Sequence, residues 1–297
     1  MKKVVLAGGT GFIGDYFKQR FEEMGCDIRI ISRQPGYIHW EDFTGIVEAL
    51  EGADLLVNLA GKSVNCRYHP RNQNEIMVSR VMTTHVLSKA LAACAHPPEV
   101  WMNSSTATIY RHAEDRPMTE EAGEIGSGFS VNVASTWEDH FYAHTIPGVR
   151  KVALRTAIVL GKEGGGMGPY KNLVKFGLGG VQGSGDQMFS WIHVEDLFRI
   201  VLFLKGRPDL SGSFNCSAPE PVTNAQFMEM MRVQMGRTYG LSASKWMLEL
   251  GSVFIRTETE LVLKSRWVVP DRLEKAGYSF EYPAINEALS EILQMSS

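Results

Sequence analysis

The chain has 297 residues, enough for two domains of ordinary size or one large domain. Lys and Arg number 30 against 33 Asp and Glu, and this balance excludes a broadly basic nucleic-acid-binding or membrane-surface protein. No apolar run approaches the ~18 residues of a membrane span, and Gly8 and Gly9 end the first apolar run too early for a signal peptide. Four irregularly spaced cysteines are typical of free thiols. We therefore expect a cytoplasmic protein without a membrane or nucleic-acid partner.

Strand and helix patterns alternate through the first half of the chain. Hydrophobic periodicity predicts strands at 3–7, 27–32, 54–60, 99–104 and 151–160, and helices at 12–24, 72–95 and 128–145. The 54–60 strand is apolar on both faces, as expected of a parallel strand inside a sheet. This alternation predicts right-handed βαβ units and an α/β fold with a Rossmann-like, doubly wound parallel sheet.

The pattern changes after Gly161. Residues 161–187 are dominated by glycine and lack a strand rhythm. Beyond them we expect a helix at 194–205, a strand at 213–217 and further helices at 224–235, 244–263 and 284–295. We predict a nucleotide-binding domain of residues 1–165 plus 191–217. Residues 166–190 plus 218–297 would form a smaller, mostly helical substrate domain.

A glycine-rich turn lies between the first predicted strand and the first predicted helix, where residues 4–14 read VVLAGGTGFIG. Its glycines fit the pattern of a dinucleotide-binding turn, which needs a tight turn, close backbone approach to pyrophosphate and close helix–strand packing. The helix N-terminus that follows would offer unpaired N–H groups to a phosphate. The residues expected to bind a dinucleotide are Gly8, Thr10, Gly11, Phe12, Ile13, Gly14, Ser32, Arg33, Leu59, Ala60, Gly61 and Ser104.

The end of the second strand distinguishes between the two nicotinamide cofactors. NAD enzymes place an acid there for the ribose 2′-hydroxyl, but this chain has Ser32 and Arg33 and no carboxylate before Glu41. An arginine beside a hydroxyl suits a 2′-phosphate. The sequence therefore favours NADP(H) over NAD(H), the alternative being a solvated surface arginine.

Several motifs resemble those of extended short-chain dehydrogenases/reductases: AGGTGFIG, NLAG, SSTATIY at 104–110 and WIHVEDL at 191–197. Further segments resemble a subfamily labelled NAD-dependent epimerase/dehydratase, or nucleoside-diphosphate-sugar epimerase, which has its own C-terminal domain. These segments are Ser79-Arg80, Trp137-Glu138, RTAIVLG at 155–161, FGLGG at 176–180, GSGDQ at 183–187 and the C-terminal Tyr282-Pro283. The resemblance covers essentially the whole chain.

The catalytic Tyr-x-x-x-Lys pair of the wider family is missing. No tyrosine of this chain has a lysine four residues later, and the resemblance places the pair at Ser130 and Ala134. The resemblance also matches Thr106 to the family's catalytic Ser/Thr, with a strand-end cap as the alternative role. Tyr110 is the candidate for the missing acid, and the alternative is that it packs or lines a pocket.

Substrate residues are suggested by position alone. Arg67 and Arg80 lie beside NLAG and could reach an anionic substrate, unless they belong to a solvated face. Gly164 and Gly165 lie in the glycine-rich segment, which covers the substrate nucleotide in nucleoside-diphosphate-sugar enzymes or else serves as a mobile lid.

Two residues or motifs known from other enzymes are missing from this sequence, a pyrophosphate-binding arginine and a metal-binding HExxH motif. Met188 and Phe189 stand where nucleoside-diphosphate-sugar enzymes place a pyrophosphate-binding arginine. His140 and His144 do not form an HExxH motif, so no metal site is predicted. Arg155 is expected to pair with a carboxylate because an unpaired buried charge is costly.

These observations predict an NADP(H)-dependent oxidoreductase or epimerase that acts on a sugar-like or small carbonyl or alcohol substrate. The alternative is a catalytically silent NADP(H)-binding sensor or partner-binding protein. Family analogy implies a homodimer formed through the helices at 72–95 and 128–145.

Overall fold

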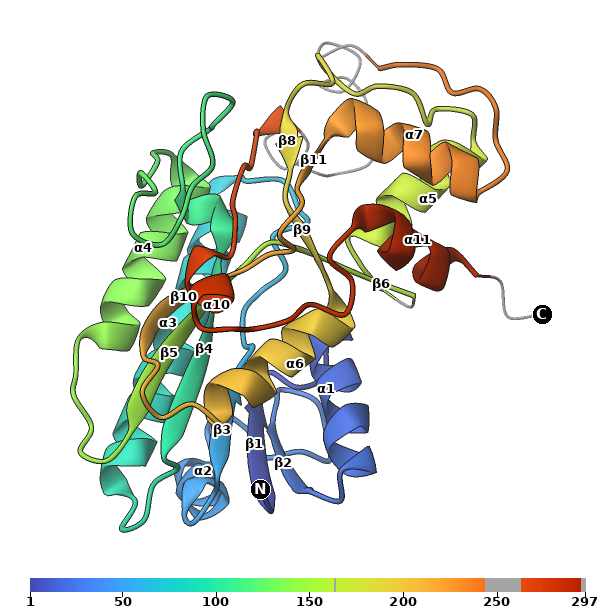
Figure 1. Ribbon diagram of the computed structural model, residues 1–297. Coiled ribbons are helices and arrows are strands. Elements are labelled where there is room, and N and C mark those ends of the chain that lie inside the picture. Colours follow the sequence, from blue (N-terminus) through green and yellow to red (C-terminus); the bar gives the residue numbers. More distant parts are fainter. Residues whose placement is uncertain (163, 244–262, 295–297) are drawn as a thin grey trace.

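The computed structural model describes residues 1–162, 164–243 and 263–294, and its centre is a six-stranded parallel sheet with the strand order β10-β5-β4-β3-β1-β2 (Figure 1). The strands are β1 (Lys3–Ala7), β2 (Asp27–Ile31), β3 (Leu55–Asn58), β4 (Val100–Thr106), β5 (Arg150–Thr156) and β10 (Gly212–Cys216). The predicted Rossmann-like α/β fold is confirmed.

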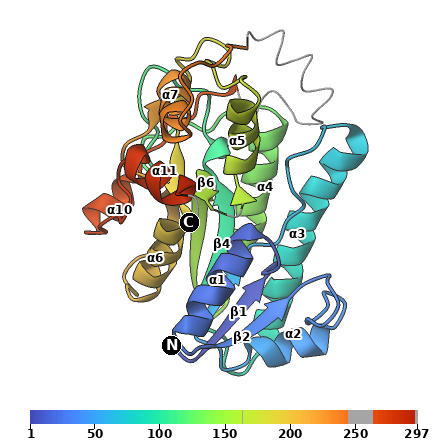
Figure 2. The same ribbon diagram turned by 90° about the vertical axis from the view of Figure 1, so that its right-hand side faces the viewer.

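Helices cover both faces of this sheet (Figures 1 and 2). Alternate residues of β1 explain why: Val4 and Leu6 enter one apolar cluster, and Val5 and Ala7 enter another. The first cluster contains side chains of α1 (Phe12–Glu23) and α6 (Val194–Lys205). The second lies beneath α2 (Phe43–Leu50), α3 (Pro70–Ala93) and α4 (Phe129–Tyr142). Helix α2 was not predicted.

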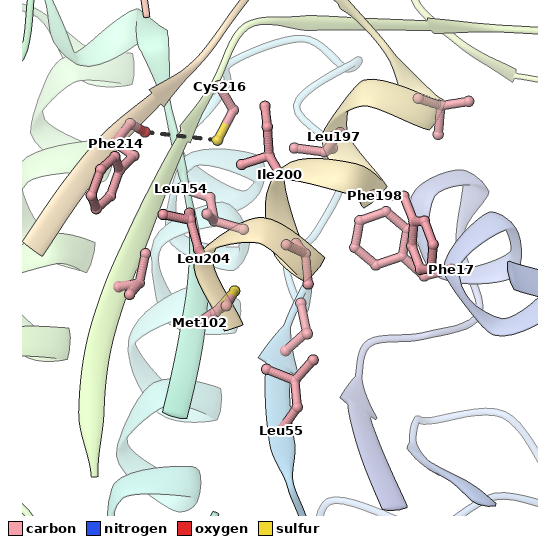
Figure 3. Packing of buried hydrophobic residues seen from close by; sticks show 14 of the residues in the cluster. Phe17, Leu55, Met102, Leu154, Leu197, Phe198, Ile200, Leu204, Phe214 and Cys216 are labelled. Carbon is pink, nitrogen blue, oxygen red and sulfur yellow. Dashed lines mark hydrogen bonds between the residues drawn. The ribbon is translucent and has the colours of Figure 1, made fainter. Parts of the chain in front are cut away.

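The first cluster fixes α1 and α6 against the sheet. Phe198 of α6 lies 5.4 Å from Phe17 and 4.9 Å from Phe21, ring centroid to ring centroid, in edge-to-face contacts. Figure 3 shows Phe198 and Phe17 in contact beside the leucine and methionine side chains of the strands. Aromatic pairs of this geometry contribute about 0.5–1.5 kcal/mol beyond the burial of their area. This packing holds the start of α1, and with it the glycine turn, at the edge of the sheet.

The predicted single strand at 151–160 is wrong, because the chain changes sheet at Ala157. β5 pairs with β4 and β10. β6 (Ile158–Gly161) pairs instead with β9 (Trp191–His193) and β7 (Gly164–Gly165) in a separate three-stranded sheet. Apolar residues lie on both sides of the break, at 152–154 and 158–160, so periodicity alone did not reveal it.

The remaining elements lie mostly at one end of the central sheet (Figure 1). They are η1 (Ala107–Ile109), α5 (Met167–Lys175), β8 (Met188–Phe189), β11 (Val222–Thr223), α7 (Asn224–Gln234), α10 (Asp271–Lys275) and α11 (Ile285–Leu293). Helix α5 lies within the glycine-rich segment 161–187 and was not predicted; it buries Met167, Tyr170 and Val174 at helical spacing. Of the predicted helix at 244–263, residues 244–262 lie outside the described residues. The boundaries of the two predicted domains stay a prediction.

Candidate functional site

The glycine turn lies at the carboxyl ends of β1 and β3. Gly8 has φ +75°, and a Cβ atom there would lie 2.6 Å from the Ala60 backbone. A Cβ on Gly14 would lie 2.5 Å from Gly9, so this glycine allows α1 to pack on the turn. Gly11 differs, because no atom lies within 4 Å of its Cβ position and no side chain caps the helix that follows it. The N-terminus of α1 is thus open to an anion.

Three predicted cofactor residues meet at the end of β2. The Thr10 and Ser32 hydroxyl oxygens lie 3.0 Å apart, and Ser32 is buried. Arg33 follows on the exposed surface, and within the described ranges its side chain has neither an ion pair nor a hydrogen bond. A guanidinium in this setting can form a bidentate contact with a phosphate.

The NLAG segment continues this edge toward β4. Asn58 pairs in register with Ala7 of β1 and with Asn103 of β4, and its side-chain amide donates to Asn103 Oδ1 at 2.6 Å. Asn58 Oδ1 also accepts from the Ala60 backbone N–H at 3.0 Å. Leu59, Ala60 and Gly61 therefore lie beside the glycine turn, where ligands bind in open α/β sheets.

Thr106 ends β4 and caps η1. Its hydroxyl oxygen accepts a hydrogen bond from the Thr108 N–H at 3.1 Å. The side chain is half-buried, and its own hydroxyl hydrogen has no acceptor in the part of the chain that the structure describes. Thr106 can therefore cap η1 and still donate to a substrate oxygen. Ser104 lies two residues before it, also half-buried.

Tyr110 lies in a buried polar network beneath this edge. Its hydroxyl donates to Asn215 Oδ1 and accepts from Arg155 Nη1, both at 2.8 Å. Burial raises the pKa of the phenol. Arg155 pairs with Glu138 through two hydrogen bonds, as predicted for a buried arginine. Tyr110 is 1 % exposed, which places it with packed residues rather than on a substrate-facing surface.

Arg80 lies between α3 and the NLAG loop. Its Nη1 donates to the carbonyls of Lys62 and Ile76 at 3.1 and 3.0 Å. A Cβ on Gly61 would lie 3.0 Å from its Cζ. Burial lowers the pKa of this guanidinium to about 10. Arg67 is half-buried in the 59–69 loop, and its carbonyl accepts from the Asn72 side chain.

Two further features near the site are not signalled by any local sequence pattern. The ring of Tyr68, in the same loop, lies 4.9 Å from that of Phe129 at the start of α4. Lys264 donates to the Thr108 carbonyl at 2.8 Å, and Arg266 donates to the Thr108 hydroxyl at 3.1 Å. These cations line a small cavity together with Phe189, so the C-terminal segment brings positive charge close to the place where the family's arginine is missing. Lys264 and Arg266 are far from Thr108 in the sequence, so only the folded structure shows that they lie together.

The predicted substrate glycines have a packing role. Cβ atoms on Gly161, Gly164 and Gly165 would lie 2.7, 2.6 and 2.7 Å from the ring of Phe12. Phe12 is the first residue of α1. These glycines therefore let the strand pair β6–β7 lie flat on the residue that follows the cofactor turn.

His193 serves the fold. Its Nδ1 accepts from the Glu195 N–H at 3.2 Å and caps α6, while Nε2 lies 3.2 Å from Glu291. Within the described ranges, no cluster of three or more potential metal ligands is found. The helices of those ranges are also too short or too polar to cross a membrane.

The sheet order and the edge residues define an extended short-chain dehydrogenase/reductase. Residues 4–216 match the model of the NAD dependent epimerase/dehydratase family, and residues 243–292 match the domain of unknown function DUF1731. The chain belongs to the NAD dependent epimerase/dehydratase family.

Relatives cover nearly the full length of the chain. It is 32% identical to the epimerase family protein SDR39U1 of Homo sapiens over 98% of this chain and 99% of that protein. A crystal structure of human SDR39U1 with NADPH superposes with a TM-score of 0.89 at 31% identity, covering 98% of this chain and 99% of the other. A nucleoside-diphosphate sugar epimerase from Corynebacterium glutamicum superposes with a TM-score of 0.79 at 27% identity, covering 98% of this chain and 58% of the other.

Proposed function

We propose that the protein is an NADP(H)-dependent oxidoreductase that acts on a small or sugar-like carbonyl or alcohol. The observation that carries this proposal is the open N-terminus of α1 at Gly11 together with the exposed Arg33 at the end of β2, which has no ion pair among the residues that the structure describes. The first suits a pyrophosphate and the second suits a 2′-phosphate. The human relative crystallised with NADPH supports the same cofactor.

The residues present fit this cofactor. Gly11 to Gly14 would hold the pyrophosphate, Ser32 and Arg33 the 2′-phosphate, and Ala60 and Gly61 would border the path toward Thr106. When bound, NADPH would supply a hydride. The Thr106 hydroxyl would donate a hydrogen bond to the substrate oxygen, holding the carbonyl carbon in place and stabilising negative charge on that oxygen.

Tyr110 is a poor proton donor for this reaction. Its hydroxyl hydrogen is engaged by Asn215, and Arg155 occupies an acceptor position of the same oxygen. Proton transfer from Tyr110 would break this buried network, which would leave polar groups unsatisfied. We propose that Tyr110 supports the strand ends instead.

A catalytically silent NADP(H)-binding protein is the second candidate. The observation that favours it is that Ser130 and Ala134 provide neither a phenol nor an ammonium on α4. Both candidates bind cofactor, so only turnover distinguishes them.

The test is a screen of small aldehydes, ketones and sugars with purified protein and NADPH, following loss of reduced-nicotinamide absorbance. Thr106→Ala should abolish turnover while NADPH binding remains. Thr119→Ala is the matched control, because Thr119 also accepts a backbone N–H, from Ala122 at 3.0 Å in an exposed turn. NADPH binding without turnover of any substrate would favour the silent protein, and no NADPH binding would refute both.

A further inference from the structure

A tyrosine and a cation lie beside the two positions at which the family's catalytic pair is missing. The ring of Tyr68 contacts that of Phe129, edge to face, and Phe129 immediately precedes Ser130. The guanidinium carbon of Arg80 lies 5.1 Å from the ring centroid of Trp137, which is one helical turn beyond Ala134. Both groups come from the segment that follows β3 rather than from α4.

We propose that Tyr68 is the proton donor of this site and that Arg80 is its charged positioning residue, together replacing the family's Tyr-x-x-x-Lys pair. This inference rests on the proposed function. It assigns acid–base chemistry to two residues from different elements, which no motif of fixed spacing would reveal.

The surroundings of Arg80 support its role. The guanidinium donates two hydrogen bonds from Nη1, and both acceptors are neutral carbonyls. Within residues 1–162, 164–243 and 263–294, no carboxylate forms an ion pair with it. A largely buried charge without a counter-charge is costly, and such groups are typical of functional sites. Arg80 can therefore stabilise negative charge that develops nearby.

Tyr68 is the ionisable group that interacts with this charge. A negative charge on the Tyr68 phenol would favour the protonated form of the Arg80 guanidinium, so the two groups lie within electrostatic range of each other. The same attraction favours a phenolate at Tyr68. This is the relation by which a lysine activates the tyrosine in the wider family.

The register of the strands and the contact with Gly61 place Arg80 at the sheet edge that carries Thr106. Asn58 of β3 lies opposite Asn103 of β4. Gly61 is three residues after Asn58, and Thr106 is three residues after Asn103, so both lie at the carboxyl ends of neighbouring strands. The guanidinium of Arg80 lies against Gly61. Arg80 thus borders the same edge as Thr106, on the side that carries the NLAG segment.

As the carbonyl carbon accepts a hydride, the O–H bond of Tyr68 breaks and a new O–H bond forms on the substrate oxygen, giving an alcohol. Tyr68 is left as a phenolate beside Arg80. Water then returns a proton to the phenolate, restoring the donor.

Other charged groups near the loop are already accounted for. Lys62 forms an ion pair with Glu75, which also pairs with Arg71 on the surface of α3. Arg67 and His69 flank Tyr68 in sequence. Because Arg67 and His69 are charged or titratable neighbours of Tyr68 in sequence, the test replaces Arg80 alone.

The first measurement is a spectroscopic titration of tyrosinate in the full chain without cofactor, with Tyr68 identified by subtracting the Tyr68→Phe variant. Burial raises the pKa of six other tyrosines: Tyr16, Tyr110, Tyr142, Tyr170, Tyr278 and Tyr282. Removing a cation at close range typically lowers the acid dissociation constant of a phenol about tenfold or more. We expect Arg80→Gln to lower the acid dissociation constant of Tyr68 by this factor and Arg80→Lys to restore it. The control Arg71→Gln should leave it unchanged. The same Tyr68 midpoint in the wild type and Arg80→Gln would overturn the proposal.

The second measurement is carbonyl reduction by the NADPH-loaded protein. Tyr68→Phe should lower kcat by about 10²–10⁴-fold, the usual contribution of a general acid, with unchanged NADPH affinity. Turnover that survives Tyr68→Phe would overturn the pair and leave the proposed function intact. An Arg80-dependent titration without turnover of any carbonyl would leave the ionising pair intact and refute the proposed function.

Discussion

The carboxylate of Glu138 accepts two hydrogen bonds from the guanidinium of Arg155, Oε1 from Nε at 2.9 Å and Oε2 from Nη2 at 2.8 Å. The Ser105 hydroxyl donates to the same Oε1 at 2.5 Å. One carboxylate thus joins α4, β5 and β4 directly behind Thr106. The side chains of the ion pair are only 10% and 13% exposed, so water screens it weakly.

Replacing Glu138 with Gln should destabilise the fold. The change leaves Arg155 charged and buried without a counter-charge, which typically costs about 3–5 kcal/mol. Urea unfolding of the variant would measure this loss. The double variant Glu138→Gln with Arg155→Met should regain much of it, because the orphaned charge is then gone. A loss below about 1 kcal/mol in the single variant, typical of exposed pairs, would contradict this.

Two glycine substitutions in the cofactor turn should differ in their effects on melting temperature and on NADPH affinity. Gly14→Ala places a Cβ 2.5 Å from Gly9, and the backbone has to shift, so both the melting temperature and NADPH affinity should fall. Gly11→Ala meets open space at an allowed φ of −110°, so the melting temperature should hold while NADPH affinity falls. Equal destabilisation by both variants would show that the open position of Gly11 has been misassigned.

Arg33 should set the choice between the two cofactors. Arg33→Asp removes a guanidinium that suits a 2′-phosphate and introduces a like charge. We expect NADPH affinity to fall by about 10–100-fold, the usual value of a charge-assisted contact, and NADH affinity to change little. Fluorescence titration with both nucleotides measures this. An equal loss of affinity for NADPH and NADH would show that Arg33 does not bind the 2′-phosphate.

His193 should make the free energy of unfolding depend on pH. Burial lowers the pKa of its imidazole below the ordinary value of about 6.5, although Glu291 opposes the shift. Below about pH 6.5 the unfolded chain binds a proton that the folded chain resists. Stability from this residue is therefore lost as pH falls, by at most about 1.4 kcal/mol per pH unit.

The matching variant is His193→Asn, since an Asn side chain can still cap α6 by accepting from Glu195. Its free energy of unfolding should change less than that of the wild type between about pH 7 and pH 5. Chemical denaturation at several pH values provides the comparison. A wild-type slope unaltered by the substitution would assign the acid sensitivity to other groups.

The sheet could be predicted because its strands carry the information locally. β1 is apolar on both faces, and each face meets its own helical layer, so composition and alternation suffice. The break at Ala157 could not be predicted in this way. It depends on the Ala157 N–H donating to Cys216 and the Ile158 N–H to Ser190, residues far along the chain.

In the site, too, features within one local segment could be predicted, and features made by distant segments could not. The glycine turn and Ser32–Arg33 were visible because they lie within single βα units. The contact of Tyr68 with Phe129 joins a loop to a helix about 60 residues later, and no local pattern signals it. Arg80 was noticed from its position beside NLAG, but only the fold shows which acceptors surround it.

The position of β10 beside β5 constrains the order in which the chain can mature on the ribosome. β5 presents an open edge until residues 212–216 have been synthesised, and such an edge is prone to wrong pairing. The Asn215 amide of β10 in turn donates to the Val269 carbonyl at 3.0 Å, so part of the support for this strand comes from the final tenth of the chain. The nascent protein therefore leaves a strand made near its middle unprotected until about sixty more residues have been synthesised, and truncation before that point favours aggregation over a smaller folded protein.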